Sequence, residues 1–248
     1  MTWQEINNKR LPFIRMGERL FRGMYHTMTS DYLSSLADYT QPEQLIDAAR
    51  SVEIDRQTVV IALTRFYQKT AIAFARSLKE KHLGRRLEIK QDEEWLAYIV
   101  EYITTKTGAK ITNIIKSHYS DIERIARLAV QEGIDNGYGM DKIARLIRKR
   151  QGEIDLWKAL RIARTEVVSA SSYGTMLGAE GLPGSKEKIW ISTFDSRSRP
   201  EHMEMDGVRV GLGEMFMVAG EAMEYPGDPN ASPENIINCR CGYEVIIT

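Results

Sequence analysis

The sequence predicts an α+β protein, with a mainly α-helical N-terminal region followed by a small α+β C-terminal module that contains a long helix and short strands. Three observations support this prediction. Up to Gly181, apolar residues recur every three or four positions, which is the period of an amphipathic helix. Beyond Gly184 the sequence becomes polar and rich in β-forming residues. Five of the seven prolines lie between Pro183 and Pro233, where they favour turns over helices.

Several stretches have the helical period and are separated by polar or glycine-containing joints. Thr40 is expected to cap the second helix, and Gly84 suits the position just beyond its end. In the last long helix, the small residues 169–172 would allow another backbone to approach closely. The expected helices comprise residues 1–40, 42–81 with an interruption near 51–56, 93–107, 121–132, 141–150 and 153–181.

Three short runs after the last helix have the composition of β-strands. They comprise residues 188–194, 208–210 and 243–248, and the turn Asp206-Gly207 precedes the second of them. Together these runs are expected to form a small sheet packed on the helix predicted at 153–181.

Charge gives little support to a general affinity for nucleic acid. The 248 residues contain 34 Lys+Arg and 34 Asp+Glu, so the formal net charge is zero. From Pro183 onward there are 6 basic against 11 acidic residues, a net of −5, which leaves a net of +5 for residues 1–182. This asymmetry either orients the chain between an acidic and a basic partner or reflects two ordinary solvated surfaces.

The sequence also limits the compartment and the enzyme class. No stretch approaches the roughly 20 apolar residues of a membrane span, and the first residues lack the apolar core of a signal peptide. The product is therefore expected to stay in the cytoplasm, where two cysteines favour a metal site or inert thiols over a disulfide. The motifs of common hydrolases, P-loop proteins, zinc peptidases and dinucleotide-binding enzymes are absent from the sequence.

The residues best suited to bind a metal are His202, Cys239 and Cys241. Imidazole and thiolate are ligands of zinc, and Asp195 or Asp206 could supply a fourth. A structural zinc ion would explain how a block rich in glycine and proline keeps one conformation. In the alternative interpretation, the cysteines are small buried apolar residues and His202 donates hydrogen bonds within a polar network.

Two further interpretations apply to the polar residues of the same block. Asp195, Arg197, Arg199 and His202 together could perform acid–base chemistry, but the same run is equally a turn whose charges satisfy loop backbone. In the sequence Pro226-Gly-Asp-Pro, Asp228 is expected to accept hydrogen bonds from backbone N–H groups, and Asn238 to act similarly.

The order of these motifs resembles a known family. The pattern is W…D-x-R-x-R-x-x-H…D-G…P-G-D-P…N-C-R-C, preceded by A-R-T-E in the last helix. It is similar to the head-morphogenesis domain of tailed bacteriophages, the Mu F-like family of minor head proteins. The similarity covers residues 163–241, about a third of the chain. The structural polar network predicted around the motif comprises Arg164, Glu166, Arg197, Arg199, Asp228 and Asn238.

The resemblance implies a minor capsid protein of a tailed phage or prophage, without enzymatic activity. Such a protein would associate with the phage portal protein and the major capsid protein, and with phage DNA in packaging or delivery. It would be found in the virion, and in the host cytoplasm during assembly. The alternative from another class is a metal-dependent nuclease or transferase-like enzyme that uses Asp195, His202 and the Cys239/Cys241 pair.

The expected domain organisation has two parts. Residues 1–120 are predicted to form a helical N-terminal arm, and residues 121–248 the Mu F-like domain. Proteolytic cleavage is expected at the polar joints 84–90 and 181–186, because they separate strong helical patterns.

Overall fold

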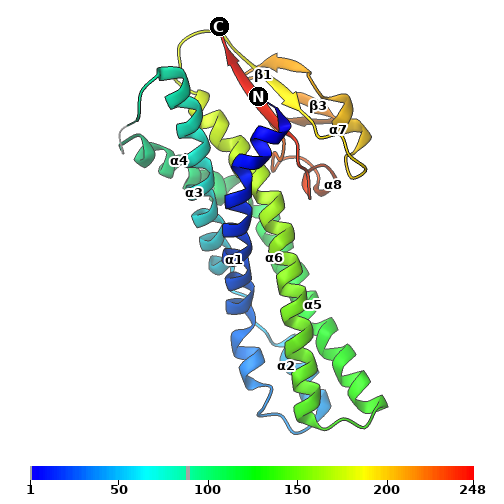
Figure 1. Ribbon diagram of the computed structural model, residues 1–248. Helices are drawn as coiled ribbons and strands as arrows, with labels where there is room; N and C mark the ends of the chain where they lie inside the picture. Colours follow the sequence, from blue (N-terminus) through cyan, green and yellow to red (C-terminus); the bar gives the residue numbers. More distant parts are fainter. Residues whose placement is uncertain (1, 88–89) are drawn as a thin grey trace. The chain divides into compact units, whose positions relative to one another are not determined.

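The computed structural model describes residues 2–87 and 90–248, and its elements confirm an α+β protein (Figure 1). None of the helices in these two ranges has the length and apolar character to cross a membrane. The described helices are α1 (Trp3–Ser35), α2 (Pro42–Arg50), α3 (Arg56–Leu83), α4 (Lys90–Lys106), α5 (Gly108–Asp135), α6 (Met140–Ala179), α7 (Pro200–Glu204) and α8 (Pro233–Ile236). The described strands are β1 (Lys186–Ile191), β2 (Arg209–Gly211), β3 (Phe216–Val218), β4 (Glu221–Met223) and β5 (Gly242–Ile247).

The residues divide into two compact units, each built from segments that are far apart in the sequence. The first unit comprises the segment that ends at Gly17 together with Leu63–Thr107 and Arg161–Thr248, and the second comprises Glu18–Ala62 and Gly108–Leu160. The division expected at residues 120 and 121 stays a prediction, and α5 is continuous across that position. Of the joint expected at 84–90, residues 88 and 89 lie outside the described ranges.

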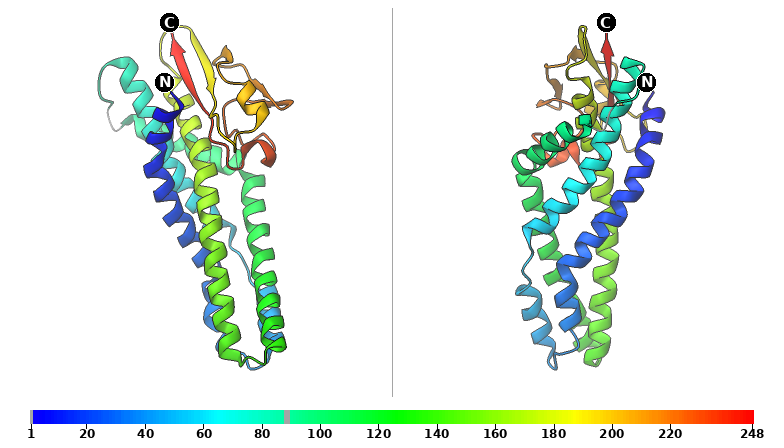
Figure 2. Two further views of the ribbon diagram at one scale, coloured as in Figure 1. Left: turned by 45° about the vertical axis from the view of Figure 1, so that its right-hand side comes forward. Right: turned by 90° about the vertical axis from the view of Figure 1, so that its left-hand side faces the viewer.

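The second unit has an apolar core between α2, α5 and the portions of α1 and α6 that belong to it. Figure 2 shows α2 beside α5. The Tyr32 hydroxyl crosses this core and donates a hydrogen bond to the Leu45 carbonyl oxygen at 3.3 Å. The buried residues of the core are Tyr32, Leu36, Leu45, Ala49, Ile122, Ile125, Ala126, Ala129, Val130, Ile143, Ala144 and Ile147.

Helices α5 and α6 are longer than the sequence pattern predicts. The interruption expected near 51–56 is present, since α2 ends at Arg50 and α3 begins at Arg56. However, the segments predicted separately at 141–150 and 153–181 form one helix, α6. Gly152 does not break this helix, because an interior glycine costs only about 1 kcal/mol. In addition, the Gln151 amide donates to Asp155 Oδ1 at 2.7 Å, one turn further along the same helix.

The start of α2 also differs from the prediction by one residue. Gln41, rather than Thr40, is the N-cap, and it has an extended backbone. The Gln44 side-chain oxygen accepts hydrogen bonds from the backbone N–H groups of both Thr40 and Gln41, each at 3.0 Å. The glutamine in the first turn therefore satisfies the N–H groups of the N-cap and of the residue before it, as the N3 side chain of a capping box does.

A cluster of buried ionisable side chains lies within the second unit. His118 is fully buried, and its Nδ1 lies 3.7 Å from Asp155 Oδ1. Burial lowers the pKa of His118 to about 3 and raises the pKa of Asp155 to about 6. The Lys158 ammonium group, which is also buried, pairs with Asp121 and donates to the Ser117 hydroxyl at 2.8 Å.

The raised pKa of Asp155 predicts a pH-dependent effect of Asp155→Asn. Below about pH 4 the carboxyl group is protonated in both the folded and unfolded chain, whereas above about pH 6 the folded chain must bury a charge. The free energy of unfolding of the wild type therefore decreases, through Asp155, as the pH rises from about 4 to about 6. The variant is expected to gain about 1–2 kcal/mol relative to wild type between pH 4 and pH 7.

Urea unfolding at a series of pH values measures this difference. Glu153→Gln is a suitable control, because Glu153 lies on the same helix and its side chain is 64% exposed. A difference between Asp155→Asn and wild type that does not change with pH would contradict the prediction.

In the first unit, α3 and α6 pack with their backbones unusually close. A Cβ atom added at Gly174 would lie 2.2 Å from the Ala71 carbonyl oxygen, and one added at Gly178 would lie 2.6 Å from the Ala75 carbonyl oxygen. The sequence predicted a close approach on this helix at residues 169–172. At the C-terminal end of α6, glycines four residues apart face alanines four residues apart.

The three strands predicted from the sequence form one antiparallel sheet in the order β2-β1-β5. In this sheet, Trp190 of β1 pairs with Tyr243 of β5, and Lys188 pairs with Val210 of β2. Met176 and Ala179 of α6 belong to the same buried cluster as Tyr243 and Val245 of β5. The sheet therefore packs on the last long helix, as the sequence predicts.

A second, two-stranded sheet was not predicted. Strands β3 and β4 pair antiparallel around Ala219 and Gly220, which both have positive φ values, of 51° and 80°. Each strand has three residues, which is too short for an alternating pattern to be recognised. Phe216, Val218 and Met223 from this hairpin join Trp190 in a buried cluster that also includes both cysteines.

Candidate functional site

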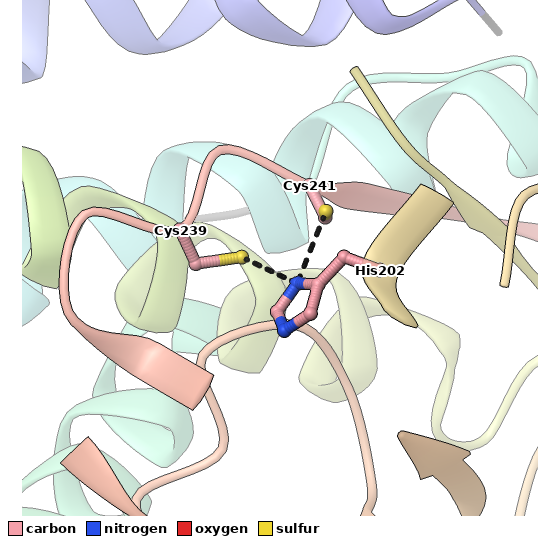
Figure 3. A group of neighbouring side chains, drawn as sticks. All are labelled: His202, Cys239 and Cys241. Carbon is pink, nitrogen blue, oxygen red and sulfur yellow. Dashed lines mark hydrogen bonds between the residues drawn. The ribbon is translucent and has the colours of Figure 1, made fainter. Parts of the chain in front are cut away.

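Three side chains that can bind a metal converge inside this C-terminal cluster (Figure 3). His202 comes from α7, and Cys239 and Cys241 come from the loop between α8 and β5. The Nδ1 atom of His202 lies 3.6 Å from the sulfur of each cysteine. All three side chains are at least 97% buried, and one donor atom from each lies within 4.8 Å of the others.

The local backbone explains how the two cysteines face the same imidazole. Asn238 has a left-handed conformation with φ of 56°, which asparagine tolerates better than most residues. Its backbone N–H donates to the Thr165 hydroxyl of α6 at 3.1 Å. Asn238 therefore ends the extended backbone after α8 and turns the following Cys-Arg-Cys segment toward α7.

A second set of residues orients the imidazole. His202 Nε2 lies 3.2 Å from the side-chain oxygen of Asn235, which makes Nε2 the donor and leaves the Nδ1 lone pair directed at the sulfurs. The Asn235 amide in turn donates to Glu221 Oε2 at 2.9 Å, and this bond lowers the pKa of Glu221. Partners of this kind fix the ring orientation of histidine ligands in metal sites.

The two thiols share hydrogen bonds in a way that favours one thiolate. The pKa of Cys241 is lowered, chiefly by a hydrogen bond from Cys239, and the pKa of Cys239 is raised by the same interaction and by burial. Burial lowers the pKa of nearby Arg10 to about 10, so its guanidinium remains charged at neutral pH and favours negative sulfur.

Two side chains of the N-terminal helix α1 donate hydrogen bonds to backbone carbonyl groups of the Cys-Arg-Cys loop. Arg10 is buried and donates to the Cys241 carbonyl oxygen at 2.9 Å and to the Ser171 hydroxyl of α6 at 2.8 Å. The Trp3 indole N–H donates to the Arg240 carbonyl oxygen at 3.0 Å. Trp3 and Arg10 of α1 thus position the loop that carries Cys239 and Cys241.

Asp195, predicted as a possible fourth ligand, has a different set of partners. Its carboxylate forms a two-pronged ion pair with Arg240, in which one oxygen lies 2.6 Å from the guanidinium, and accepts the backbone N–H of Arg197 at 2.8 Å. The Arg240 bond is the largest cause of its lowered pKa. The carboxylate is not part of the three-residue donor group, and Asp206 accepts the Ser192 backbone N–H at 2.7 Å instead.

The remaining residues of the predicted polar network lie in different parts of the fold. Glu166 is buried, and its Oε2 accepts a hydrogen bond from the Tyr67 hydroxyl oxygen at 2.8 Å. Arg164, in contrast, is exposed. Arg199 donates to the Ile237 carbonyl oxygen at 2.8 Å. Asp228 is buried and accepts the backbone N–H groups of residues 224 and 230 at 2.7 and 2.9 Å.

The donor geometry fits tetrahedral zinc. With typical Zn–S and Zn–N bond lengths and a tetrahedral angle, the sulfur and nitrogen of two ligands lie roughly 3.5 Å apart. Both sulfur–Nδ1 distances here are 3.6 Å. The three residues could therefore hold zinc as one imidazole and two thiolates, with one coordination position left for another ligand.

Comparison with known proteins places this site within a phage family. The family described as Phage Mu protein F like protein matches residues 124–244, which include all three donors. This match confirms the resemblance seen in the sequence: this part of the chain belongs to the Mu F-like family.

Two curated relatives share part of their length with the chain. One is "NAD(+)--arginine ADP-ribosyltransferase EFV" of Enterococcus faecalis, which is 28% identical over 148 residues, or 58% of this chain and 30% of the relative. The other is "Uncharacterized protein YqbB" of Bacillus subtilis, 28% identical over 166 residues, or 60% of this chain and 54% of the relative. The chain thus spans about a third of one relative and about half of the other. No solved structure matches the chain.

The sequence reasoning missed several residues that position the donors. Asn235 and Glu221 carry no local motif that relates them to His202, because the contacts form only in the folded module. Arg10 did leave a signal. It lies among apolar positions on one face of α1, where a charged side chain requires a buried partner.

Asn235→Leu tests whether the imidazole is oriented for metal binding. The variant keeps a similar side-chain volume but loses the hydrogen bond to Nε2, so zinc affinity is expected to fall about 10–100-fold. Competition with a zinc-binding dye measures the affinity. Asn230→Leu, which changes an exposed asparagine in the same module, is the control and should match wild type. Equal affinity of Asn235→Leu and wild type would contradict this role.

Proposed function

We propose that the chain is a head-morphogenesis protein of a tailed bacteriophage or prophage, acting as a minor capsid protein near the portal. The observation that carries the proposal is the Mu F-like match over residues 124–244, which contains the donor residues and the loop that joins them. The partners are the portal protein and the major capsid protein, with phage DNA passing nearby during packaging or delivery. The protein is then a component of virions and, during assembly, of the host cytoplasm.

Particles from a lysogen or infected culture that encodes the chain test this proposal. Mass spectrometry of purified procapsids and virions should detect the chain at a small fraction of the copy number of the major capsid protein. Cross-linking within those particles should join it to the portal protein. Absence from both particle types would overturn the proposal, and cross-links to the major capsid protein alone would remove the portal from it.

Zinc in this protein is proposed to have a structural role. His202 and both cysteines are buried among the apolar side chains of the C-terminal cluster. The cavity beside them, lined also by Thr193 and Asn238, has a volume of about 10 Å³, close to the minimum that holds a single water molecule. A bound ion would tie α7 to the Cys-Arg-Cys loop, which otherwise meet through hydrogen bonds and apolar contacts.

A transferase is the second candidate, and two observations favour it. One relative is named as an ADP-ribosyltransferase, and a three-ligand zinc site leaves a position open, as catalytic zinc sites do. Incubation with labelled NAD⁺ and an arginine-rich acceptor tests the activity directly. The structural proposal expects no transfer above background. Transfer that is abolished by His202→Ala, in a variant that remains folded, would establish the enzyme instead.

A further inference from the structure

The first unit contains a cleft of about 830 Å³, and His202, Cys239 and Cys241 are not among its lining residues. Its volume is within the range of small-ligand sites, which is typically about 300–1,000 Å³. One wall is a face of α1 that includes Trp3 and Ile14, and another is formed by Arg164 and Val167 of α6. The third wall comprises Arg197 and Arg199 together with residues from 233–240, a stretch that includes α8 and the loop after it.

The charge of this cleft is strongly positive. Five arginines line it, and Glu234 is the single acidic residue among its described lining residues. Three of the five, Arg197, Arg199 and Arg240, come from the block after Pro183, which has only 6 basic residues and a net charge of −5. Half of the basic residues of this acidic block therefore line one cavity. An ordinary solvated surface gives no reason for them to be concentrated in this way.

The five arginines fall into two groups. Arg10 and Arg240 are occupied by the contacts described above, with loop carbonyl groups and Asp195 respectively. At the mouth of the cleft, Arg164 is exposed and forms no hydrogen bond with any residue in the described ranges. The Arg197 side chain is 77% exposed, and its guanidinium is 3.9 Å from Asp195. These two side chains, with the remaining donors of Arg199, can bind an incoming anion.

The chemistry of the lining selects the kind of anion. All five cations are arginines, whose planar guanidinium donates paired hydrogen bonds to phosphate oxygens. The lining also includes Trp3, Ile14 and Ile237, which offer apolar and aromatic surface. A lone inorganic anion gains nothing from such surface, whereas a nucleotide places its phosphate on the arginines and its base on the apolar wall.

We propose that this cleft is a binding site for the phosphate and base of a nucleotide unit, either free or at an unpaired part of a nucleic-acid strand. A duplex, whose stacked bases are enclosed by two backbones, cannot enter a cavity of this volume. The proposal does not rest on the head-morphogenesis function, because it follows from the lining residues alone.

The experiment uses the full chain and a fluorescent oligothymidylate, with binding followed by polarisation. Arg164→Gln combined with Arg197→Gln is expected to weaken binding about tenfold or more, since each exchange removes charge-assisted hydrogen bonds. The control is Arg145→Gln combined with Lys149→Gln, which removes the same charge from an exposed basic run on α6. The control should stay within about twofold of wild type, and the slope of log affinity against log salt should decrease only for the cleft variant.

Competition identifies the source of the nucleotide. Displacement by a mononucleotide at micromolar to low millimolar concentration indicates a free nucleotide site, whereas displacement only by unlabelled single strand indicates a strand. In either case inorganic phosphate should compete much less well. The proposal is overturned if the oligonucleotide does not bind, if both double variants weaken it equally, or if a duplex of the same length binds better than the single strand.

Discussion

His202→Ala is expected to lower the stability of the C-terminal module by about 3 kcal/mol or more, which corresponds to a fall in melting temperature of roughly 6–12 °C. The substitution removes a buried ring that contacts Trp190, with ring centroids 5.8 Å apart, and leaves the side-chain oxygen of Asn235 without its donor. Loss of a bound zinc ion would add to this cost. Cys239→Ser should act in the same direction, because it replaces a buried sulfur by a hydroxyl group.

A chelator separates the contribution of metal from that of packing. Thermal unfolding should be measured with and without the chelator for wild type, His202→Ala and His82→Ala, in which an exposed histidine outside the module is changed. The chelator is expected to lower the melting temperature of wild type and His82→Ala but not that of His202→Ala. Unchanged melting of His202→Ala and Cys239→Ser would contradict a structural role for this site, with or without metal.

Gly174→Ala is expected to destabilise the first unit by about 1–3 kcal/mol or more. The new methyl group would lie 2.2 Å from the Ala71 carbonyl oxygen and 2.6 Å from its Cα atom. Because these are backbone atoms, a side-chain rotation cannot relieve the contact, and α3 and α6 must move apart. That movement would also disturb Tyr173 on α6, whose ring stacks on Tyr102 of α4 at a centroid distance of 4.1 Å.

Gly152→Ala provides a matched control for this prediction. It makes the same chemical change in the same helix, at a position where an added Cβ meets no atom within 4 Å. An interior helical glycine is less favourable than alanine, so this variant should gain about 0.5–1 kcal/mol. Urea unfolding followed by circular dichroism measures both effects. A destabilisation of Gly152→Ala similar to that of Gly174→Ala would show that close packing is not the cause.

The sequence allowed the prediction of features that depend on local pattern. Helical periodicity located the long helices. Runs with the composition of β-strands located β1, β2 and β5, which were also expected to pack on the last helix. Chemical type and motif order were enough to single out His202, Cys239 and Cys241. Each of these inferences uses residues that are close in sequence, or residue types that are rare in the chain.

The features that were not predicted depend on contacts between distant segments. The two segments predicted separately form one helix, α6, because Gly152 costs too little to break it, and the Gln151–Asp155 bond across this point is not revealed by apolar periodicity. Asp195 was a reasonable metal ligand by type, but the fold gives it Arg240 as a partner. Likewise, the division into two units, each drawn from separated segments, cannot be read from a linear boundary between patterns.

The bonds from Trp3 and Arg10 to the Cys-Arg-Cys loop have a consequence for synthesis on the ribosome. The donors are synthesised 237 and 231 residues before the carbonyl groups that they bind. Until that loop emerges, Arg10 lacks its acceptors, and the two thiols, once they emerge, stay accessible to oxidants and to free metal until the loop packs on α1. This part of the fold therefore closes only after the Cys-Arg-Cys loop has emerged, and a substitution of Trp3 or Arg10 would act on a loop more than 230 residues away in the sequence.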